Sequence, residues 1–184
     1  PLPGVVLRIV DPETLNPLSN SAVGLILAHG PNIFRGYLNK ETKSPFIEFD
    51  GVRWYNTGDL GKLLDNGALI LEGRMKRFVK IGGEMISLVA IEETFLPLVA
   101  EKVEKTGLPQ LVVMPGPEEG GRPKLVLFIS KSLDLMRANQ MLRQSGFSNL
   151  VKIDKVCTID ALPMTGTGKI AYRQLEKMMH TQFG

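Results

Sequence analysis

The stretch 163-PMTGTGKIAYRQL-175 places Lys169 directly after a Thr- and Gly-rich loop and just before a helical pattern. A lysine on such a loop is typical of phosphate binding, because glycine permits close backbone approach and the ammonium supplies charge. The P-loop, G-x-x-x-x-G-K-[ST], is excluded. The chain has Pro163 where the first Gly is required and Ile170 where the Mg²⁺-binding hydroxyl is required. We therefore expect another kind of phosphate chemistry at Lys169.

Two further segments combine polar groups with glycine, 55-YNTGDLG-61 and 73-GRMKRFVKIGGEMIS-87. Each has a purely structural interpretation when it is taken alone. Asp59 can close a turn by accepting backbone N–H groups. Arg74 can be a surface ion-pair partner of Glu72, which would contribute little.

The glycine pair and the lysine also have structural interpretations. Gly82-Gly83 can be an ordinary bend, and Lys169 can be a solvated lysine at the start of a helix. The positive end of the helix dipole disfavours a cation there, however, which favours a ligand role for the lysine.

The elements expected before residue 76 are strands. Short apolar runs at 5-VVLRIV-10 and 23-VGLILA-28 are bounded by Pro, Gly, Asn and Ser. The runs 62-KLL-64 and 69-LIL-71 flank Asp65-Asn66-Gly67. Asn-Gly predicts a hairpin, because both residues tolerate positive φ.

Strand and helix patterns alternate after residue 76, which predicts an α/β (α+β) fold with a small three-stranded sheet faced by helices. The expected strands are 77–81, 111–114, 125–129 and 151–159. Gly116-Pro117 and Gly120-Gly121 are expected to join the second of these strands to the third.

Three apolar series with helical spacing predict the helices. They are Leu88-Ile91-Phe95, Leu135-Ala138-Leu142 and Ala171-Leu175-Met178. Pro97 should end the first helix because it lacks an N–H, and Gly146 should close the second. The change from strand signals to the alternating pattern falls near 73-GRMK-76.

The composition is that of a globular protein with one or two domains: 184 residues, 43% hydrophobic and 22% charged. No run approaches the roughly 18 apolar residues of a membrane span, and the first residues do not resemble a signal peptide. The single cysteine, Cys157, excludes an internal disulfide and indicates a reducing compartment. The net charge is −1 over residues 1–75 and +4 over 76–184. This mildly basic second half suits a nucleotide and is too weak to favour nucleic acid.

Together, in this order and spacing, the three segments resemble the signature motifs of the acyl-adenylate-forming superfamily. That superfamily includes acyl-CoA and acyl-carrier-protein synthetases, peptide-synthetase adenylation domains and firefly luciferase. Its usual forms are Y-x-T-G-D-L, G-R-x-[DK]-x-x-[IV]-K-x-x-G and L-P-x-T-x-x-G-K-[IL]. The segment 30-GPNIFRGYLNKET-42 is also similar to a family segment, so the resemblance covers essentially the whole chain.

The phrase 75-MKRFVKIGGEMISL-88 is most similar to the bacterial acyl-carrier-protein synthetase and 2-acylglycerophosphoethanolamine acyltransferase group. Two positions depart from the usual pattern. Glu84-Met85 stands where most of the family has an aromatic-Arg pair, and the usual Glu-Ile-Glu reads Ala90-Ile91-Glu92.

The resemblance implies a reaction in two steps. A carboxylate attacks the α-phosphate of ATP to give acyl-AMP and pyrophosphate, and the acyl group then passes to an acceptor. Lys169 is implied to touch both anions, whose repulsion is about 4 kcal/mol at about 4 Å and an effective dielectric near 20. Asp59 is implied to bind both ribose hydroxyls, Arg74 the ribose or phosphate side, and Thr57 the nucleotide.

The resemblance also implies a change of catalytic face between the two steps. Lys76 takes the hinge position, about which a small C-terminal domain rotates. After that rotation Lys80, Gly82 and Gly83 line the tunnel for the thiol arm of phosphopantetheine, where glycine allows close approach. The implied cofactor is ATP with Mg²⁺, whose ligands are expected outside this chain.

The chain starts without Met and lacks the family's upstream phosphate loop, S-G-T-T-G-x-P-K, and its adenine-binding segment. We therefore expect residues 1–75 to be the C-terminal β-rich portion of the large AMP-binding domain. Residues 76–184 are expected to be the small mobile C-terminal domain. The chain alone should be inactive.

The expected partners are ATP or AMP, a fatty acid, and acyl carrier protein or a lysophospholipid as acceptor, with no nucleic acid. The expected location is the cytoplasm, or the cytoplasmic face of the inner membrane through regions outside this chain. One alternative is an acyl-CoA synthetase for another carboxylic acid. Another is a non-catalytic module that docks a carrier protein or a membrane. His29 and His180 have no spacing that suggests a metal site or a catalytic triad.

Overall fold

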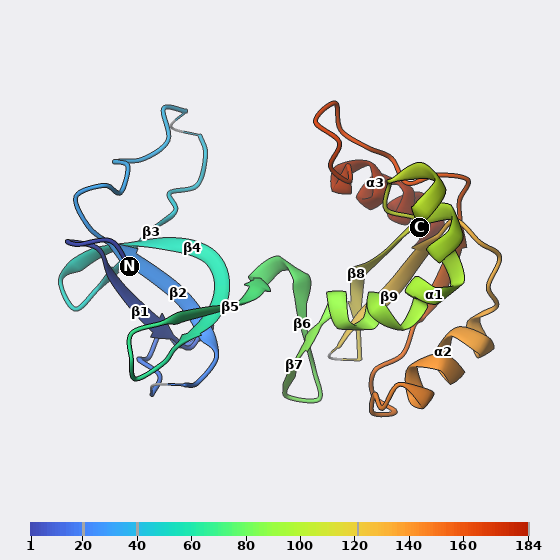
Figure 1. Cartoon of the computed structure of the whole chain (residues 1–184), viewed down its shortest axis with the longest axis horizontal. Coiled ribbons are helices and arrows are strands. Elements are labelled where there is room, and N and C mark those ends of the chain that lie inside the picture. Colours follow the sequence, from blue (N-terminus) through green and yellow to red (C-terminus); the bar gives the residue numbers. More distant parts are fainter. Residues whose placement is uncertain (20, 40, 121, 184) are drawn as a thin grey trace. The chain divides into compact units, whose positions relative to one another are not determined.

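The computed structural model describes residues 1–19, 21–39, 41–120 and 122–183, and the side chains of residues 180–183 lie outside that description. The chain divides into two compact units, Pro1–Arg77 and Phe78–Gly184 (Figure 1). Lys76 belongs to the first unit in this division, whereas the sequence predicted a boundary just before it.

The first unit is a five-stranded antiparallel sheet in the order β1-β2-β4-β3, with β5 also paired to β4 (Figure 1). The strands are β1 (Val6–Val10), β2 (Gly24–His29), β3 (Phe46–Phe49), β4 (Val52–Leu63) and β5 (Leu69–Arg74). One edge of β4 pairs with β2, and its other edge is shared by β3 and then β5. The predicted Asn-Gly hairpin is confirmed, since Leu63 pairs with Leu69 across it.

The core of the first unit comes mainly from β1, β2 and the middle of β4. Its buried residues are Ile9, Val10, Leu25, Ile26, Leu27, Ala28, Trp54 and Leu60. Four consecutive β2 residues, 25–28, are buried, and this strand has a paired neighbour on each edge. Within the described residues this unit holds no α-helix, in agreement with the expectation of strands before residue 76.

The second unit combines a hairpin, a three-stranded sheet and three helices. Its strands are β6 (Phe78–Ile81), β7 (Glu84–Ser87), β8 (Leu111–Glu119), β9 (Arg122–Ile129) and β10 (Lys155–Thr158). Its helices are α1 (Leu88–Thr106), α2 (Leu135–Gln144) and α3 (Tyr172–Phe183). The sheet order is β10-β9-β8, with β8 antiparallel and β10 parallel to β9. The predicted fold class and its small three-stranded sheet are confirmed.

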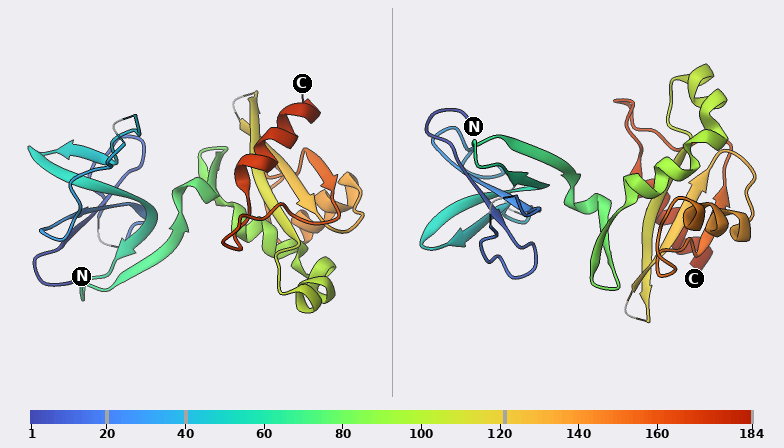
Figure 2. Two further views of the ribbon diagram at one scale, coloured as in Figure 1. Left: turned by 90° about the horizontal axis from the view of Figure 1, so that it is seen from above. Right: turned by 60° about the horizontal axis from the view of Figure 1, so that its bottom comes forward.

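Both faces of this sheet are covered, so the second unit has three layers that can be followed in Figures 1 and 2. Leu125, Leu127 and Ile129 of β9 pack in one cluster with buried residues of α1 and α2. Val126 and Phe128 point to the other face and pack in a second cluster with residues of α3. Strand β9 is therefore buried on both faces and anchors the unit.

The prediction that Pro97 ends the first helix is wrong. Helix α1 continues from Leu88 to Thr106 with Pro97 inside it. The apolar stripe continues past the proline, because Phe95 and Val99 are both buried while Pro97 is exposed on the solvent side. Burial of that stripe offsets the hydrogen bond that proline cannot donate.

Several smaller boundaries differ from the predictions. The strand expected over 151–159 is limited to β10, and Val151 and Ile153 are buried without belonging to a strand. Strand β8 continues through Gly116-Pro117, where its register to β9 shifts, so these residues do not form the connection. Gly121 of the expected connection lies outside the described residues. No signal predicted β3 or β7.

No helix in the described ranges is long and apolar enough to span a membrane.

Candidate functional site

Thr57, Gly58 and Asp59 form a bulge in β4. The register between β2 and β4 shifts between Leu25 and Leu27, so these three residues stand opposite Ile26 alone. The Thr57 hydroxyl donates a 2.8 Å hydrogen bond to the Ile26 carbonyl and accepts a 3.0 Å bond from the Asp59 N–H. Gly58 has φ +71°, a left-handed conformation that favours glycine. A bulge re-aims the side chains that it carries, here that of Asp59.

The bulge places Asp59 beside Arg74, its cross-strand partner at the end of β5. Arg74 Nε lies 2.9 Å from Asp59 Oδ1, and Arg74 Nη1 donates a 3.4 Å bond to the Thr57 carbonyl. The Asp59 side chain is 27% exposed and that of Arg74 is 69% exposed. The structure thus brings together all three residues that were predicted to bind the nucleotide.

The structural interpretations of Asp59 and Arg74 taken singly do not hold. Glu72 pairs with Lys62 at 3.2 Å, while Arg74 pairs with Asp59. The N–H groups of the bulge are accepted by the side chains of Asn56 and Thr57, so Asp59 is not needed to close it. In the described part of the chain no hydrogen bond reaches Asp59 Oδ2, which leaves that oxygen available to a ligand.

Lys169 lies in the second unit, on a closed loop whose ends, Met164 and Ile170, form an antiparallel bridge. The Thr165 N–H donates a 2.7 Å bond to the Lys169 carbonyl, and the Gly168 N–H donates a 3.0 Å bond to the Thr165 carbonyl. Lys169 is exposed. Helix α3 begins three residues later, so the lysine precedes the helix rather than occupying its first turn.

Gly82 and Gly83 form the two-residue turn of the β6–β7 hairpin, since Ile81 pairs with Glu84. Their φ values are +60° and +87°, the pair of positive angles that a type I′ turn requires. A Cβ on Gly82 would lie 2.6 Å from Leu150 Cδ1, whereas a Cβ on Gly83 would meet nothing within 4 Å. The open side of the turn is therefore at Gly83.

The turn and the Lys169 loop lie at opposite ends of the second unit in Figure 1 and in the right-hand view of Figure 2. Lys80 is exposed on β6 of the same hairpin. Lys76 is exposed in a short 3-10 helix, η1 (Met75–Arg77), that follows β5 and contains no buried residue.

His29 does not form a metal site with other side chains in the described ranges. His29 Nδ1 lies 3.0 Å from the Arg53 carbonyl, and the side chain of His180 lies outside the described residues. Groups of three or more His, Cys, Asp or Glu able to hold a metal are likewise absent from the described ranges.

The shifted pKa values in the second unit belong to structural groups. Burial raises the pKa of the Asp154 carboxyl. Hydrogen bonds from Arg122 and from the Leu125 N–H lower that pKa, and the net pKa is below its usual value. Burial raises the pKa of the Cys157 thiol, which packs in the core beside α3. Cys157 therefore fills apolar space in the core.

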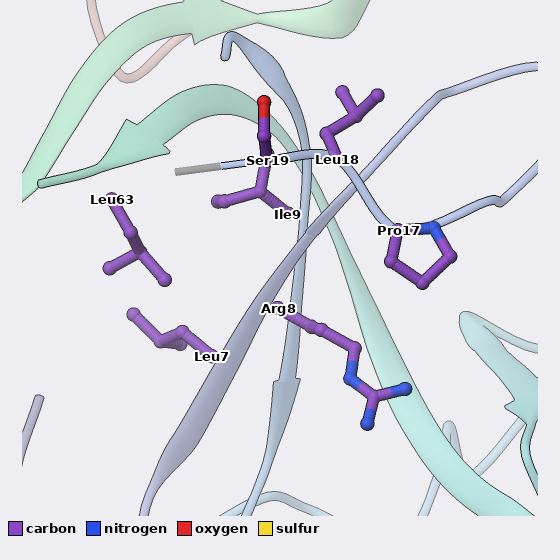
Figure 3. A pocket seen from close by; sticks show the side chains of 7 residues that line it. All are labelled: Leu7, Arg8, Ile9, Pro17, Leu18, Ser19 and Leu63. Carbon is purple, nitrogen blue, oxygen red and sulfur yellow. The ribbon is translucent and has the colours of Figure 1, made fainter. Parts of the chain in front are cut away.

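The first unit also has a hollow of about 160 Å³ (Figure 3). Its lining residues are Leu7, Arg8, Ile9, Pro17, Leu18, Ser19 and Leu63. The Arg8 guanidinium is held by Asp50 at 2.9 Å and lies over two aromatic rings. The hollow is smaller than the roughly 300 Å³ of typical ligand pockets and contains none of the predicted site residues.

No protein-family model matches the chain. Two curated relatives are similar over most of it. Enterobactin synthase component E of Escherichia coli (strain K12) is 30% identical over 166 residues, which are 89% of this chain and 30% of that protein. 4-coumarate–CoA ligase 1 of Glycine max is 28% identical over 181 residues, which are 92% of this chain and 56% of that protein.

A solved structure is similar over nearly the whole chain. ATP-bound MatB from Rhodopseudomonas palustris has a TM-score of 0.69 and 27% identity, and the match covers 99% of this chain and 35% of that one. The chain therefore spans 30%, 56% and 35% of the lengths of these three proteins.

Proposed function

We propose that this chain is the C-terminal part of an ATP-dependent ligase of the acyl-adenylate-forming superfamily. The superfamily is supported by the named relatives, by the ATP-bound structural neighbour and by the three motifs. The observation that carries the proposal is the Asp59–Arg74 pair on the β4 bulge. It is a partly exposed carboxylate with one oxygen held and the other open, which is the arrangement needed to bind a diol.

Asp59 would accept hydrogen bonds from the two ribose hydroxyls, and the open Oδ2 provides the acceptor. Arg74 holds the carboxylate in place through Oδ1 at 2.9 Å, and much of its guanidinium stays exposed for the ribose or phosphate side. Thr57 supports the site by fixing the bulge through the Ile26 carbonyl.

Lys169 would supply the charge for the first step. A carboxylate oxygen attacks the α-phosphorus, the bond to the pyrophosphate leaving group breaks, and acyl-AMP and pyrophosphate form. Negative charge gathers where these anions meet, and an ammonium that contacts both offsets their repulsion. The exposed position of Lys169 suits a partner that arrives from solution or from another part of the protein.

The β6–β7 turn would serve the second step, in which an acceptor thiol attacks the acyl carbonyl and AMP leaves. The open side at Gly83 suits a thin phosphopantetheine arm, whereas Gly82 packs toward Leu150. Lys80 lies on the same hairpin, and Lys76 would be the hinge about which the two faces exchange.

The finer proposal is a fatty acid as acyl donor and acyl carrier protein or a lysophospholipid as acceptor. It rests on the phrase 75-MKRFVKIGGEMISL-88 alone. The alternative is a ligase for another carboxylic acid with CoA as acceptor. The relative named as a CoA ligase supports this alternative as well as it supports the finer proposal. Pyrophosphate release by the whole enzyme should be measured with fatty, short-chain and aromatic acids, followed by transfer to carrier protein, CoA or lysophospholipid. Activity confined to an aromatic acid and CoA would overturn the finer proposal.

The general proposal is tested on the two half-reactions of the whole enzyme. Lys169→Ala should slow adenylate formation by about 10²–10³-fold, the usual cost of losing one preorganised charge-stabilising donor. Transfer from chemically supplied acyl-AMP to the thiol should stay nearly intact, because the α-phosphate no longer reacts in that step. Both rates are measured separately, by isotope exchange between pyrophosphate and ATP and by thioester formation.

Lys131→Ala, at another exposed lysine of the second unit, is the control and should change neither rate. Gly83→Asn should slow transfer selectively, since Asn tolerates positive φ and adds a side chain on the open side of the turn. Equal slowing of both steps by Lys169→Ala would refute the assignment of this lysine to adenylation.

A further inference from the structure

Thr165 contacts the backbone of Lys169 on both sides. Its N–H donates a 2.7 Å bond to the Lys169 carbonyl, and its Oγ1 accepts a 3.2 Å bond from the Lys169 N–H. The hydroxyls of Thr165 and Thr167 lie 3.0 Å apart. Either hydroxyl can be the donor in this contact, because the Thr165 oxygen has a second lone pair besides the one that accepts from Lys169.

The base of this loop is fixed to the rest of the second unit. The Ala171 N–H donates a 2.8 Å bond to the Pro163 carbonyl, and Leu162 is buried in the cluster that contains Leu175 of α3. Lys102 of α1 donates a 2.8 Å bond to the Asp160 carbonyl just before the loop. The exposed tip is thus built on a rigid base, and the Thr165 bonds are what fix Lys169 within the tip.

We infer that Thr165 is a positioning residue for Lys169, an inference that rests on the proposed role of Lys169 in adenylation. A lysine side chain has a long flexible stem, so its ammonium can be held near a reacting phosphate only if its backbone is fixed. Among the described residues, Thr165 is the residue whose side chain accepts a hydrogen bond from the Lys169 N–H.

Thr165→Val is the decisive change, because valine keeps the branched shape and removes only the hydroxyl. Thr165→Ser retains the hydroxyl and should behave like the unaltered protein. Thr167→Val is the matched control on the same loop, since within the described residues the Thr167 hydroxyl contacts that of Thr165 and makes no hydrogen bond to Lys169.

The first readout is amide hydrogen exchange at Lys169 in the 184-residue chain, which needs no activity. Exchange should be about three- to tenfold faster in Thr165→Val, the effect of losing one hydrogen bond. It should be unchanged in Thr165→Ser and within about twofold in Thr167→Val, since the Lys169 N–H keeps its acceptor in both.

The second readout is adenylate formation by the whole enzyme. Thr165→Val should lower kcat about five- to tenfold and leave the KM for ATP within about twofold, because a loosened lysine affects the transition state rather than nucleotide binding. Thr165→Ser should restore kcat. Unchanged Lys169 exchange in Thr165→Val, or a kcat loss equal to that in Thr167→Val, would overturn the inference. The proposed function fails separately, if Lys169→Ala has no effect on adenylate formation.

Discussion

The Asp59–Arg74 pair is better suited to binding than to holding the fold. Arg74 is 69% exposed, and an ion pair this open to water contributes on the order of 0–1 kcal/mol to stability. The bulge that carries Asp59 is held instead by the Thr57 hydroxyl on the Ile26 carbonyl. Substitution at Asp59 can therefore change ligand affinity without unfolding the first unit.

Asp59→Asn should raise the KM for ATP in the whole enzyme by about 10–100-fold, since a charged hydrogen bond to the ribose is worth about 1.5–3 kcal/mol. The thermal midpoint of the 184-residue chain should change by less than about 2 °C. The control is Glu72→Gln, which breaks the Lys62–Glu72 pair on the neighbouring strands. Equal changes in KM for the two variants would show that Asp59 has no special part in nucleotide binding.

Helix α1 shows how packing overrides a local stop signal. Its buried positions, among them Ile91, Phe95 and Val99, continue on one face past Pro97. The proline ring lies on the exposed side, so the penalty is confined to the backbone. The helix ends only at Gly107, whose φ of +65° and N–H bond to the Val103 carbonyl form a left-handed cap.

Pro97→Ala should stabilise the second unit by about 1–3 kcal/mol, because alanine restores a helix hydrogen bond and removes the ring clash. Ala100→Gly, also on the exposed face of α1, should instead destabilise it by about 1 kcal/mol. Urea unfolding followed by helical circular dichroism measures both changes. A neutral or destabilising Pro97→Ala would mean that the helix depends on a kink at the proline.

The two units have separate cores, so a charge effect in one of them should not appear in the other. Asp154 belongs to the second unit, where its carboxylate binds Arg122 at 3.0 and 2.5 Å and accepts the Leu125 N–H at 2.8 Å. These bonds tie the segment before β10 to β9. They also hold the Asp154 pKa below its usual value against the opposing effect of burial.

A lowered pKa in the folded state stabilises that state above the ordinary Asp pKa of about 3.9, and this stabilisation is lost as the pH falls through the lower folded value. The second unit should therefore lose stability in acid, and Asp154→Asn should be less stable by about 1.5–3 kcal/mol at pH 7 with a weaker acid dependence. Helical circular dichroism reports the second unit, and the single tryptophan, Trp54, reports the first. An acid loss that persists fully in Asp154→Asn would exclude this carboxyl as its origin.

Local chemistry in the sequence determined much of the architecture. Asn66-Gly67 predicted its hairpin because turn geometry depends on the residues in the turn. The three apolar helical series and the main strands were also predicted, because burial of one face imposes a period that can be read from the residues alone. The motifs pointed to the superfamily, while the roles of the individual site residues stay predictions.

Only the tertiary structure decided which groups meet. The sequence places Asp59 and Arg74 fifteen positions apart, and their 2.9 Å contact depends on the strand register and on the bulge opposite Ile26. Register is set by packing between distant segments, and the continuation of α1 past Pro97 has the same origin. Such long-range contacts outweigh local preferences of about 1–3 kcal/mol. They join residues that are far apart in the sequence, and for that reason no local pattern specifies them.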